Sequence, residues 1–221
     1  MGQKIRPDVL RLGITQFWNV RWIPKRSFRA MLQEDEVIRA VIQEKISAAG
    51  VAKIEIERTA SACRIFIKAA RPGFIIGRGG QGIEQLSRAI EAALKKMQHK
   101  LKILPTHAAI NLNVEELKRS EIAASNVAQN IAADLEKRLP CRRTMKKAID
   151  LVMQHKEVGG VKIRFSGRLD GAEIARREWM AKGKLPLQTL RANIEYGEGT
   201  AFTVYGTVGI KVWIYKGEIL N

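Results

Sequence analysis

Apolar positions recur with two different periods along the first half of the chain. A helix-spaced face follows the acidic run 34–36, which suits the positive end of a helix dipole: Val37, Ile38, Val41, Ile42, Ile46 and Ala49. Gly50 ends this pattern. Apolar and polar residues then alternate over 53–57 and again over 63–67, on either side of the small residues 59–62. The pattern predicts a helix over 34–50 and a hairpin of two strands.

A second helical pattern follows a glycine-rich stretch, with apolar residues at Ile83, Leu86, Ile90, Leu94 and Met97. Residues 110–114 then alternate as a strand. The order is helix, strand, strand, glycine turn, helix, strand. This order matches a type II KH domain, in which three strands are backed by helices. We therefore expect such a domain over 31–117, preceded by an irregular basic arm over 1–30.

The remaining sequence predicts a second α+β domain over 118–221. A helix with apolar residues four apart runs to Pro140, where proline ends it, and a second helix covers about 142–156. Strand patterns follow at 161–165, 190–196, 202–204 and 208–214, while 167–188 reads as irregular or partly helical. Two helices on a four-stranded antiparallel sheet are expected. On the last strand, Trp213 and Tyr215 alternate outward, where they could stack on a base, contact a partner protein or form a side cluster.

The glycine turn Gly77-Arg78-Gly79-Gly80 is the first candidate site. Glycine lets two backbones approach closely because it has no Cβ atom, and the helix that follows directs free N–H groups and a positive dipole end at the turn. Arg78 adds a full positive charge. The GXXG loop of a KH domain grips the sugar-phosphate backbone of about four nucleotides with the same features.

The same glycines admit other interpretations. Gly77, Gly79 and Gly82 also form G-x-G-x-x-G, the fingerprint of dinucleotide-binding enzymes, which needs a preceding strand and a later acidic residue. Pro72 and Gly73 leave only three apolar residues before the turn, and 97–100 contains no acid. A P-loop would need Gly-Lys-Ser/Thr, which is missing. A plain turn before a helix remains open.

The formal net charge of +17, from 39 basic and 22 acidic residues, favours a polyanionic partner. The excess is uneven, because residues 1–33 hold seven basic residues and one acid whereas 34–70 hold six of each. A membrane surface is disfavoured, since no helix pairs a basic face with a broad aromatic or leucine-rich one. Two cysteines suit a reducing cytoplasm, and three scattered histidines make no metal site. No catalytic constellation stands out, so neither enzyme activity nor a cofactor is expected.

Three further basic groups are candidates for RNA binding. The helix at 142–156 carries four cations opposite its apolar face: Arg142, Arg143, Lys146 and Lys147. The loop at 164–179 mixes glycine and arginine and includes Arg168 and Arg176. The arm contributes Lys4, Arg6 and Arg11. A solvated helix face, a structural loop with its own ion pairs and a merely soluble tail are the alternatives.

Several of these segments resemble bacterial small-subunit ribosomal protein three, of the universal ribosomal protein three family. The resemblance rests on 1–7 with 11–14, Ile54–Arg58, Ala70–Gly73, the glycine turn and Arg142–Ala148. It is closest over Ser166–Leu169, Gly171–Arg176, Leu190–Ala192 and Gly209–Ile214, and it covers nearly the whole chain. The insert around 95–104 is longer and more basic than the family pattern, and many relatives carry a further basic tail.

The resemblance implies a cytoplasmic ribonucleoprotein setting in translation. The family lies in the head of the small ribosomal subunit, binds small-subunit rRNA and neighbours ribosomal proteins ten and fourteen. It also lines the channel through which messenger RNA enters, and Arg142, Arg143 and Lys146 match its basic positions there. A free-standing KH regulator of single-stranded RNA and a dinucleotide-binding enzyme are the alternatives from other classes.

Overall fold

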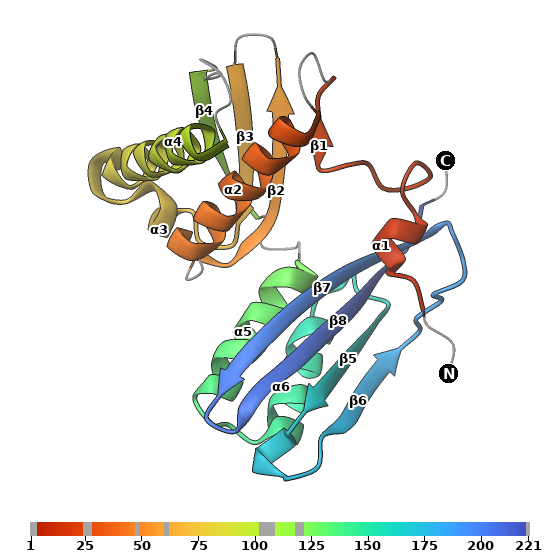
Figure 1. Ribbon diagram of the computed structural model, residues 1–221. Coiled ribbons are helices and arrows are strands. Elements are labelled where there is room, and N and C mark those ends of the chain that lie inside the picture. The colour runs from red at the N-terminus through yellow and green to blue at the C-terminus, as the bar shows by residue number, and fades with distance from the viewer. Residues whose placement is uncertain are drawn as a thin grey trace. The chain divides into compact units, whose positions relative to one another are not determined.

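The computed structural model describes residues 4–23, 28–46, 49–59, 62–101, 109–117 and 122–219. The chain divides into two compact units (Figure 1). One runs from Asn19 to Leu117, and the other joins the residues up to Trp18 with those from 122 onward. The predicted division into an arm, a KH domain and a C-terminal domain stays a prediction. Within the described residues, no helix is both long and apolar enough to cross a membrane.

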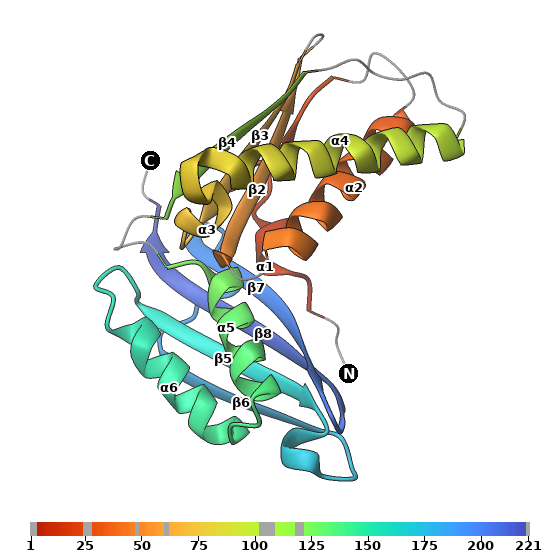
Figure 2. The ribbon, with the colours of Figure 1, turned by 90° about the vertical axis from the view of Figure 1, so that its left-hand side faces the viewer.

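The unit from Asn19 to Leu117 has the predicted order of elements. They are β1 (Val20–Arg21), α2 (Phe28–Ile46), β2 (Val51–Arg58), β3 (Ala62–Ala69), α3 (Gly73–Ile76), α4 (Gln81–Leu101) and β4 (Ala109–Glu116). The sheet order is β1-β2-β3-β4, with β2 antiparallel to β3 and β4 parallel to β3. Helices α2 and α4 pack on one face of the sheet (Figure 2). The short parallel strand β1 adds a fourth strand to the three expected.

Alternating strand residues and the apolar helix faces form one core in this unit. Its members are aliphatic: Ile38, Ile42, Ile54, Ile56, Ile65, Ile67, Leu86 and Ile90. Helix α2 begins at Phe28, earlier than predicted, so the acids expected at its start lie in its middle. Glu34 and Asp35 are 4% and 3% exposed and pair with Arg58 at 2.5 Å each. Burial alone would lower the pKa of Arg58, but the charge of Asp35 and the bond to Glu34 raise it overall.

The other unit is a four-stranded antiparallel sheet covered on one face by two helices. Its elements are α1 (Pro7–Leu10), α5 (Ala124–Glu136), α6 (Cys141–Met153), β5 (Gly160–Gly167), β6 (Arg176–Gly183), β7 (Ala192–Thr203) and β8 (Gly206–Glu218). The strand order is β6-β5-β8-β7. Helices α5 and α6 cover the face into which β5 and β8 send Val161, Ile163, Phe165, Val208, Ile210, Val212 and Ile214 (Figure 2). The α+β prediction is confirmed.

Two strands differ from the sequence prediction, each for a physical reason. Strand β6 lies where an irregular segment was expected, because it is an edge strand of mostly exposed residues and lacks a clear apolar alternation. Strand β7 is one continuous strand where two were expected, because Gly197 and Gly199 interrupt its apolar pattern. A Cβ at Gly197 would lie 2.5 Å from the backbone nitrogen of Ser125, so this glycine lets α5 approach the strand.

Candidate nucleic-acid interface

The glycine turn lies between the short helix α3 and the long helix α4. Gly77, Gly79 and Gly80 have φ angles of 69°, 62° and 80°, in the left-handed region that favours glycine. A Cβ at Gly79 or Gly80 would meet no atom of the described part of the chain within 4 Å. The backbone of this turn is therefore open to an approaching ligand.

The turn presents positive charge to that open side. Arg78 is exposed, and none of the ion pairs found among the described residues includes it. Helix α4 begins at Gln81, so its first N–H groups lack acceptors within the helix and its dipole adds partial positive charge. These features suit a phosphate group.

The dinucleotide-binding interpretation of the same glycines is wrong. A short helix, α3, precedes the turn where that fingerprint needs a strand. Gly82 has a packing role, because a Cβ there would come within 2.9 Å of the carbonyl oxygen of Ile76. This glycine is therefore explained by the contact between α3 and α4.

Sequence reasoning missed an aromatic group beside the turn. Phe74 is 66% exposed on α3, and the guanidinium carbon of Arg71 lies 5.6 Å from its ring centroid. An exposed aromatic ring stacked with a cation can accept a base. The signal in the sequence was an aromatic residue next to Gly73, immediately before the glycine turn.

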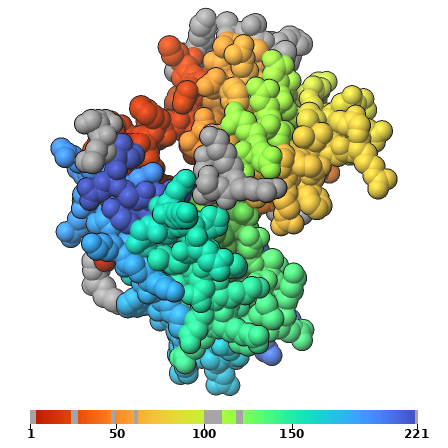
Figure 3. Space-filling view, turned by 180° about the vertical axis from the view of Figure 1, so that it is seen from behind, coloured from red at the N-terminus to blue at the C-terminus, as the bar shows by residue number. Residues whose placement is uncertain are grey.

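The four cations of α6 are exposed, and its apolar residues are buried as predicted. The outer surface of this helix, in teal, is uncovered in the view from behind (Figure 3). Two of the cations have acidic neighbours: Arg142 binds Glu178 of β6 through two hydrogen bonds of 3.0 and 3.2 Å, and Lys147 lies 3.8 Å from Asp134. Hydrogen bonding to Arg142 lowers the pKa of Glu178.

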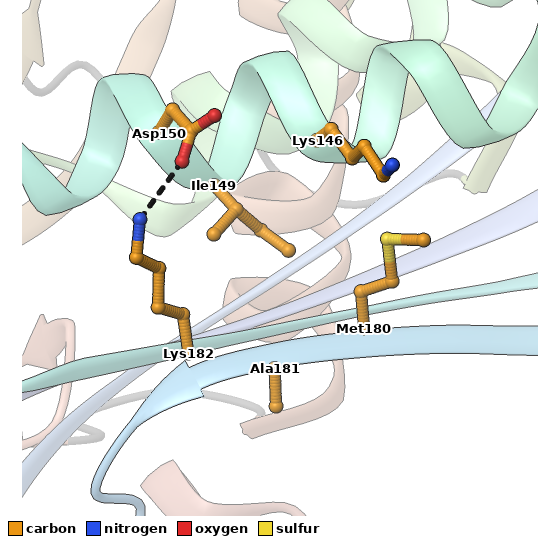
Figure 4. A pocket seen from close by; sticks show the side chains of 6 residues that line it. All are labelled: Lys146, Ile149, Asp150, Met180, Ala181 and Lys182. Atoms are coloured by element: carbon orange, nitrogen blue, oxygen red, sulfur yellow. Dashed lines mark hydrogen bonds and ion pairs between the residues drawn. The ribbon is translucent and has the colours of Figure 1, made fainter.

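An open pocket of about 410 Å³ lies between α6 and the edge strand β6. Figure 4 shows Lys146 and Ile149 above it and Met180 below, with Asp150 bound to Lys182 at 3.0 Å. The ammonium group of Lys146 lies at the edge of this pocket. The pocket therefore joins the cationic helix face to a strand edge.

The two candidate arginines of the 164–179 loop have different surroundings. Arg168 donates hydrogen bonds to the carbonyl oxygens of Ala172 at 3.0 Å and Tyr205 at 3.3 Å, so it supports the loop. Arg176 begins β6, is exposed, and adds its charge beside Glu178. Arg168 therefore has a structural role through carbonyl contacts rather than through the ion pairs of the structural alternative, whereas Arg176 remains exposed at the start of β6.

The arm holds its three candidate cations in three different ways. Lys4 is exposed, and Arg6 pairs with Asp8 at 3.2 Å while lying 5.1 Å from the ring centroid of Tyr196. Arg11 is fully buried. Its guanidinium donates to backbone carbonyls, so Arg11 does not belong to the proposed interface.

Models of two known protein families match the two parts of the chain. Residues 37–122 match a family model described as "KH domain", which contains the glycine turn. Residues 131–214 match one described as "Ribosomal protein S3, C-terminal domain", which contains all of α6 and most of the four-stranded sheet.

Full-length relatives cover the whole chain. Proteins named "Small ribosomal subunit protein uS3" are 48% identical in Parvibaculum lavamentivorans, 47% in Desulforudis audaxviator and 45% in Syntrophomonas wolfei. Each alignment spans 100% of this chain, and 89%, 95% and 91% of those relatives, respectively.

Proposed function

Because the chain belongs to the small ribosomal subunit protein uS3 family, we propose that it grips RNA at two surfaces, the glycine turn and the outer face of α6. The protein is a non-enzymatic, RNA-binding component of the small subunit of the bacterial cytoplasmic ribosome, and it binds rRNA. This membership overturns both alternatives, the free-standing regulator and the dinucleotide-binding enzyme.

The glycine turn is proposed as the phosphate clamp of a KH domain over 31–117. The observation that carries this proposal is the open turn backbone at the start of α4, with the exposed Arg78 inside it. Backbone N–H groups there would bind phosphate oxygens without reading sequence. Phe74 beside the turn would take one base by stacking.

The outer face of α6 is proposed to line the channel through which messenger RNA enters. Arg143 and Lys146 are exposed, and the ion pairs found in the described part of the chain include neither, so both cations are available to phosphates. Arg142 is held by Glu178 and Lys147 lies near Asp134, so these two would have to exchange partners. The family resemblance further supports a place in the subunit head, beside ribosomal proteins ten and fourteen.

The clamp is tested by Arg78→Asp combined with Gly79→Asp. The left-handed backbone of Gly79 tolerates aspartate better than most side chains, and the space around it is open, so the fold should persist. We expect affinity for small-subunit rRNA to fall about ten-fold or more in a filter-binding titration, because two acids replace a cationic turn.

The matched control combines Arg88→Asp with Gly13→Asp. Arg88 is exposed on α4, and Gly13 has a positive φ angle and open space around it. The control therefore makes the same change of charge and imposes a similar backbone strain, but at positions outside the glycine turn. Equal losses of affinity in the two double variants, with unchanged circular dichroism, would refute the clamp.

The channel assignment is tested by replacing Arg142, Arg143 and Lys146 together with alanine. These residues lie opposite the buried face of α6, so the helix should stay folded and the protein should enter subunits. We expect slower translation of a message with a strong downstream hairpin and unchanged translation of an unstructured message. The control removes three exposed cations elsewhere in the same unit: Lys137, Lys156 and Lys184. Equal rates on the two messages, or failure of the triple variant to enter subunits, would count against the assignment.

A further inference from the structure

The face of the C-terminal sheet that α5 and α6 leave uncovered carries aromatic and basic side chains. In β5, Ile163 points into the core, whereas Lys162 and Arg164 on either side of it point to the opposite face. Figure 4 shows the same alternation in β6, where Met180 points toward α6 and Ala181 points away. The aromatic–basic face consists of Lys162, Arg164, Trp179, Tyr196 and Trp213.

Strand pairing places these five residues side by side across four strands. Lys162 pairs with Trp213, Arg164 pairs with Trp179, and Tyr196 pairs with Trp213. The Lys162 ammonium lies 4.6 Å from the ring centroid of Trp179 and 5.9 Å from that of Trp213. The Arg164 guanidinium carbon lies 5.9 Å from the Trp213 ring, and the Tyr196 and Trp213 ring centroids are 5.5 Å apart. Rings and cations therefore form one continuous patch.

The outermost ring of this patch is largely open to solvent. Trp179 lies on the edge strand β6 and is 60% exposed, although Lys162 contacts its ring. A single exposed tryptophan needs no explanation. A tryptophan that continues a row of rings and cations provides a surface on which a further flat group can stack.

The positive charge of this face is poorly compensated by the chain's own acids. The Nε atom of Arg164 is buried and has no hydrogen-bond partner among the residues that the structure describes. Burial, followed by the neighbouring cations Lys4 and Arg164, lowers the pKa of Lys162. The acid beside Tyr196, Glu198, lies 3.4 Å from Lys211 and is hydrogen-bonded to the tyrosine hydroxyl. Such a cluster would be stabilised by a polyanion.

We propose that the aromatic–basic face binds single-stranded RNA, with one base stacked on Trp179 and neighbouring phosphates bound by Lys162 and Arg164. The proposal rests on the RNA-binding function of this protein and adds a third contact surface to the glycine turn and α6. Four-stranded sheets that stack bases on surface aromatic rings are an established mode of RNA recognition. Tryptophan, tyrosine and arginine are also enriched at protein interfaces, but the uncompensated positive charge of Lys162 and Arg164 favours a polyanion over a protein partner.

The test measures the affinity of the full chain for an unstructured oligoadenylate at several salt concentrations. We expect Trp179→Ala to weaken binding between about five-fold and a hundred-fold, the range for losing one stacked base. Trp179→Phe should restore most of this loss. The slope of log affinity against log salt should not change in either variant, since no charge is removed. Lys162→Gln should instead reduce that slope by roughly 0.7, the value for one phosphate contact on a single strand.

The matched control is Phe202→Ala, because Phe202 is 72% exposed, pairs with Thr207 near the end of β7, away from the Tyr196–Trp213 pair, and is not one of the five residues of the aromatic–basic face. If Trp179→Ala and Phe202→Ala bind the oligonucleotide equally well while wild type still binds it, the proposal is wrong and the ribosomal function stands. If wild type itself fails to bind RNA, the proposed clamp fails together with this face. If Trp179→Ala binds RNA normally but is depleted from assembled subunits, the face contacts a protein and the proposal is overturned.

Discussion

Replacing Arg11 by methionine should detach the N-terminal segment from the C-terminal sheet while leaving the glycine turn and the outer face of α6 unchanged. Arg11 is fully buried, and its guanidinium donates four hydrogen bonds of 2.7–3.1 Å to the backbone carbonyls of Pro7, Leu187, Thr189 and Ala192. Methionine preserves most of the aliphatic stem and removes every donor. The four carbonyls then lose their partner at once.

The magnitude follows from those four bonds. Hydrogen bonds to a charged donor contribute about 1.5–3 kcal/mol each, so four of them set an upper limit of about 6–12 kcal/mol. The actual loss should be smaller, because the freed carbonyls can reach water once the segment lifts. We expect local opening of residues 4–18 to become easier by about 3 kcal/mol, which is a roughly hundred-fold higher open population.

Hydrogen exchange followed by mass spectrometry measures this opening segment by segment. Peptides from 4–18 and 187–196 should exchange about a hundred-fold faster in Arg11→Met, while peptides from 31–46 and 62–97 should keep their wild-type rates. The control is Arg6→Met, which removes an exposed cation paired with Asp8 and should change opening by less than about 1 kcal/mol. Wild-type exchange over 4–18 in Arg11→Met would refute the structural role.

Three further outcomes are expected. Arg58→Met should lower the free energy of unfolding by about 3–5 kcal/mol in urea, because it leaves two buried acids unpaired; a loss near that of Arg21→Met, an exposed neighbour, would contradict this. Gly197→Ala should destabilise the C-terminal unit by about 3 kcal/mol, since its Cβ would overlap α5, whereas a near-neutral thermal melt would show that α5 can shift. Burial, followed by a hydrogen bond with Asp170, raises the pKa of Cys141 to about 11, so the unfolded thiol ionises first. Stability should therefore fall as pH rises from about 9 toward 11, and Cys141→Ala should flatten that part of the pH profile.

The first unit followed from sequence because its signals are local. Alternation in β2 and β3, helical spacing in α4 and the glycine turn each lie within one element, and their order predicted the arrangement. The start of α2 could not be predicted, because Glu34 and Asp35 resembled a helix-start signal. Their actual partner, Arg58, lies more than 20 residues away in the chain.

The site was less predictable than the fold, because charge patterns do not show pairing. Arg11 and Arg6 looked alike in the sequence, yet one is buried in carbonyl contacts and the other is exposed. No sequence pattern indicated a partner for Arg142, but in the structure it donates a hydrogen bond to Glu178 of β6. The aromatic–basic face was only partly predicted from the sequence, because Trp179 lies in the segment that was expected to be irregular.

The long sequence separation between Arg11 and its carbonyl partners has a consequence for synthesis of the chain. Residues 4–18 leave the ribosome before the rest of their unit, because Ala192, which Arg11 binds, follows Arg11 by 181 residues. At 5–20 residues per second, the segment waits roughly 10 to 40 s for its binding site to be made. During that time the unit from Asn19 to Leu117 emerges complete, with its own core. The nascent protein therefore carries this cationic segment without its binding site until residues 187–192 have been made.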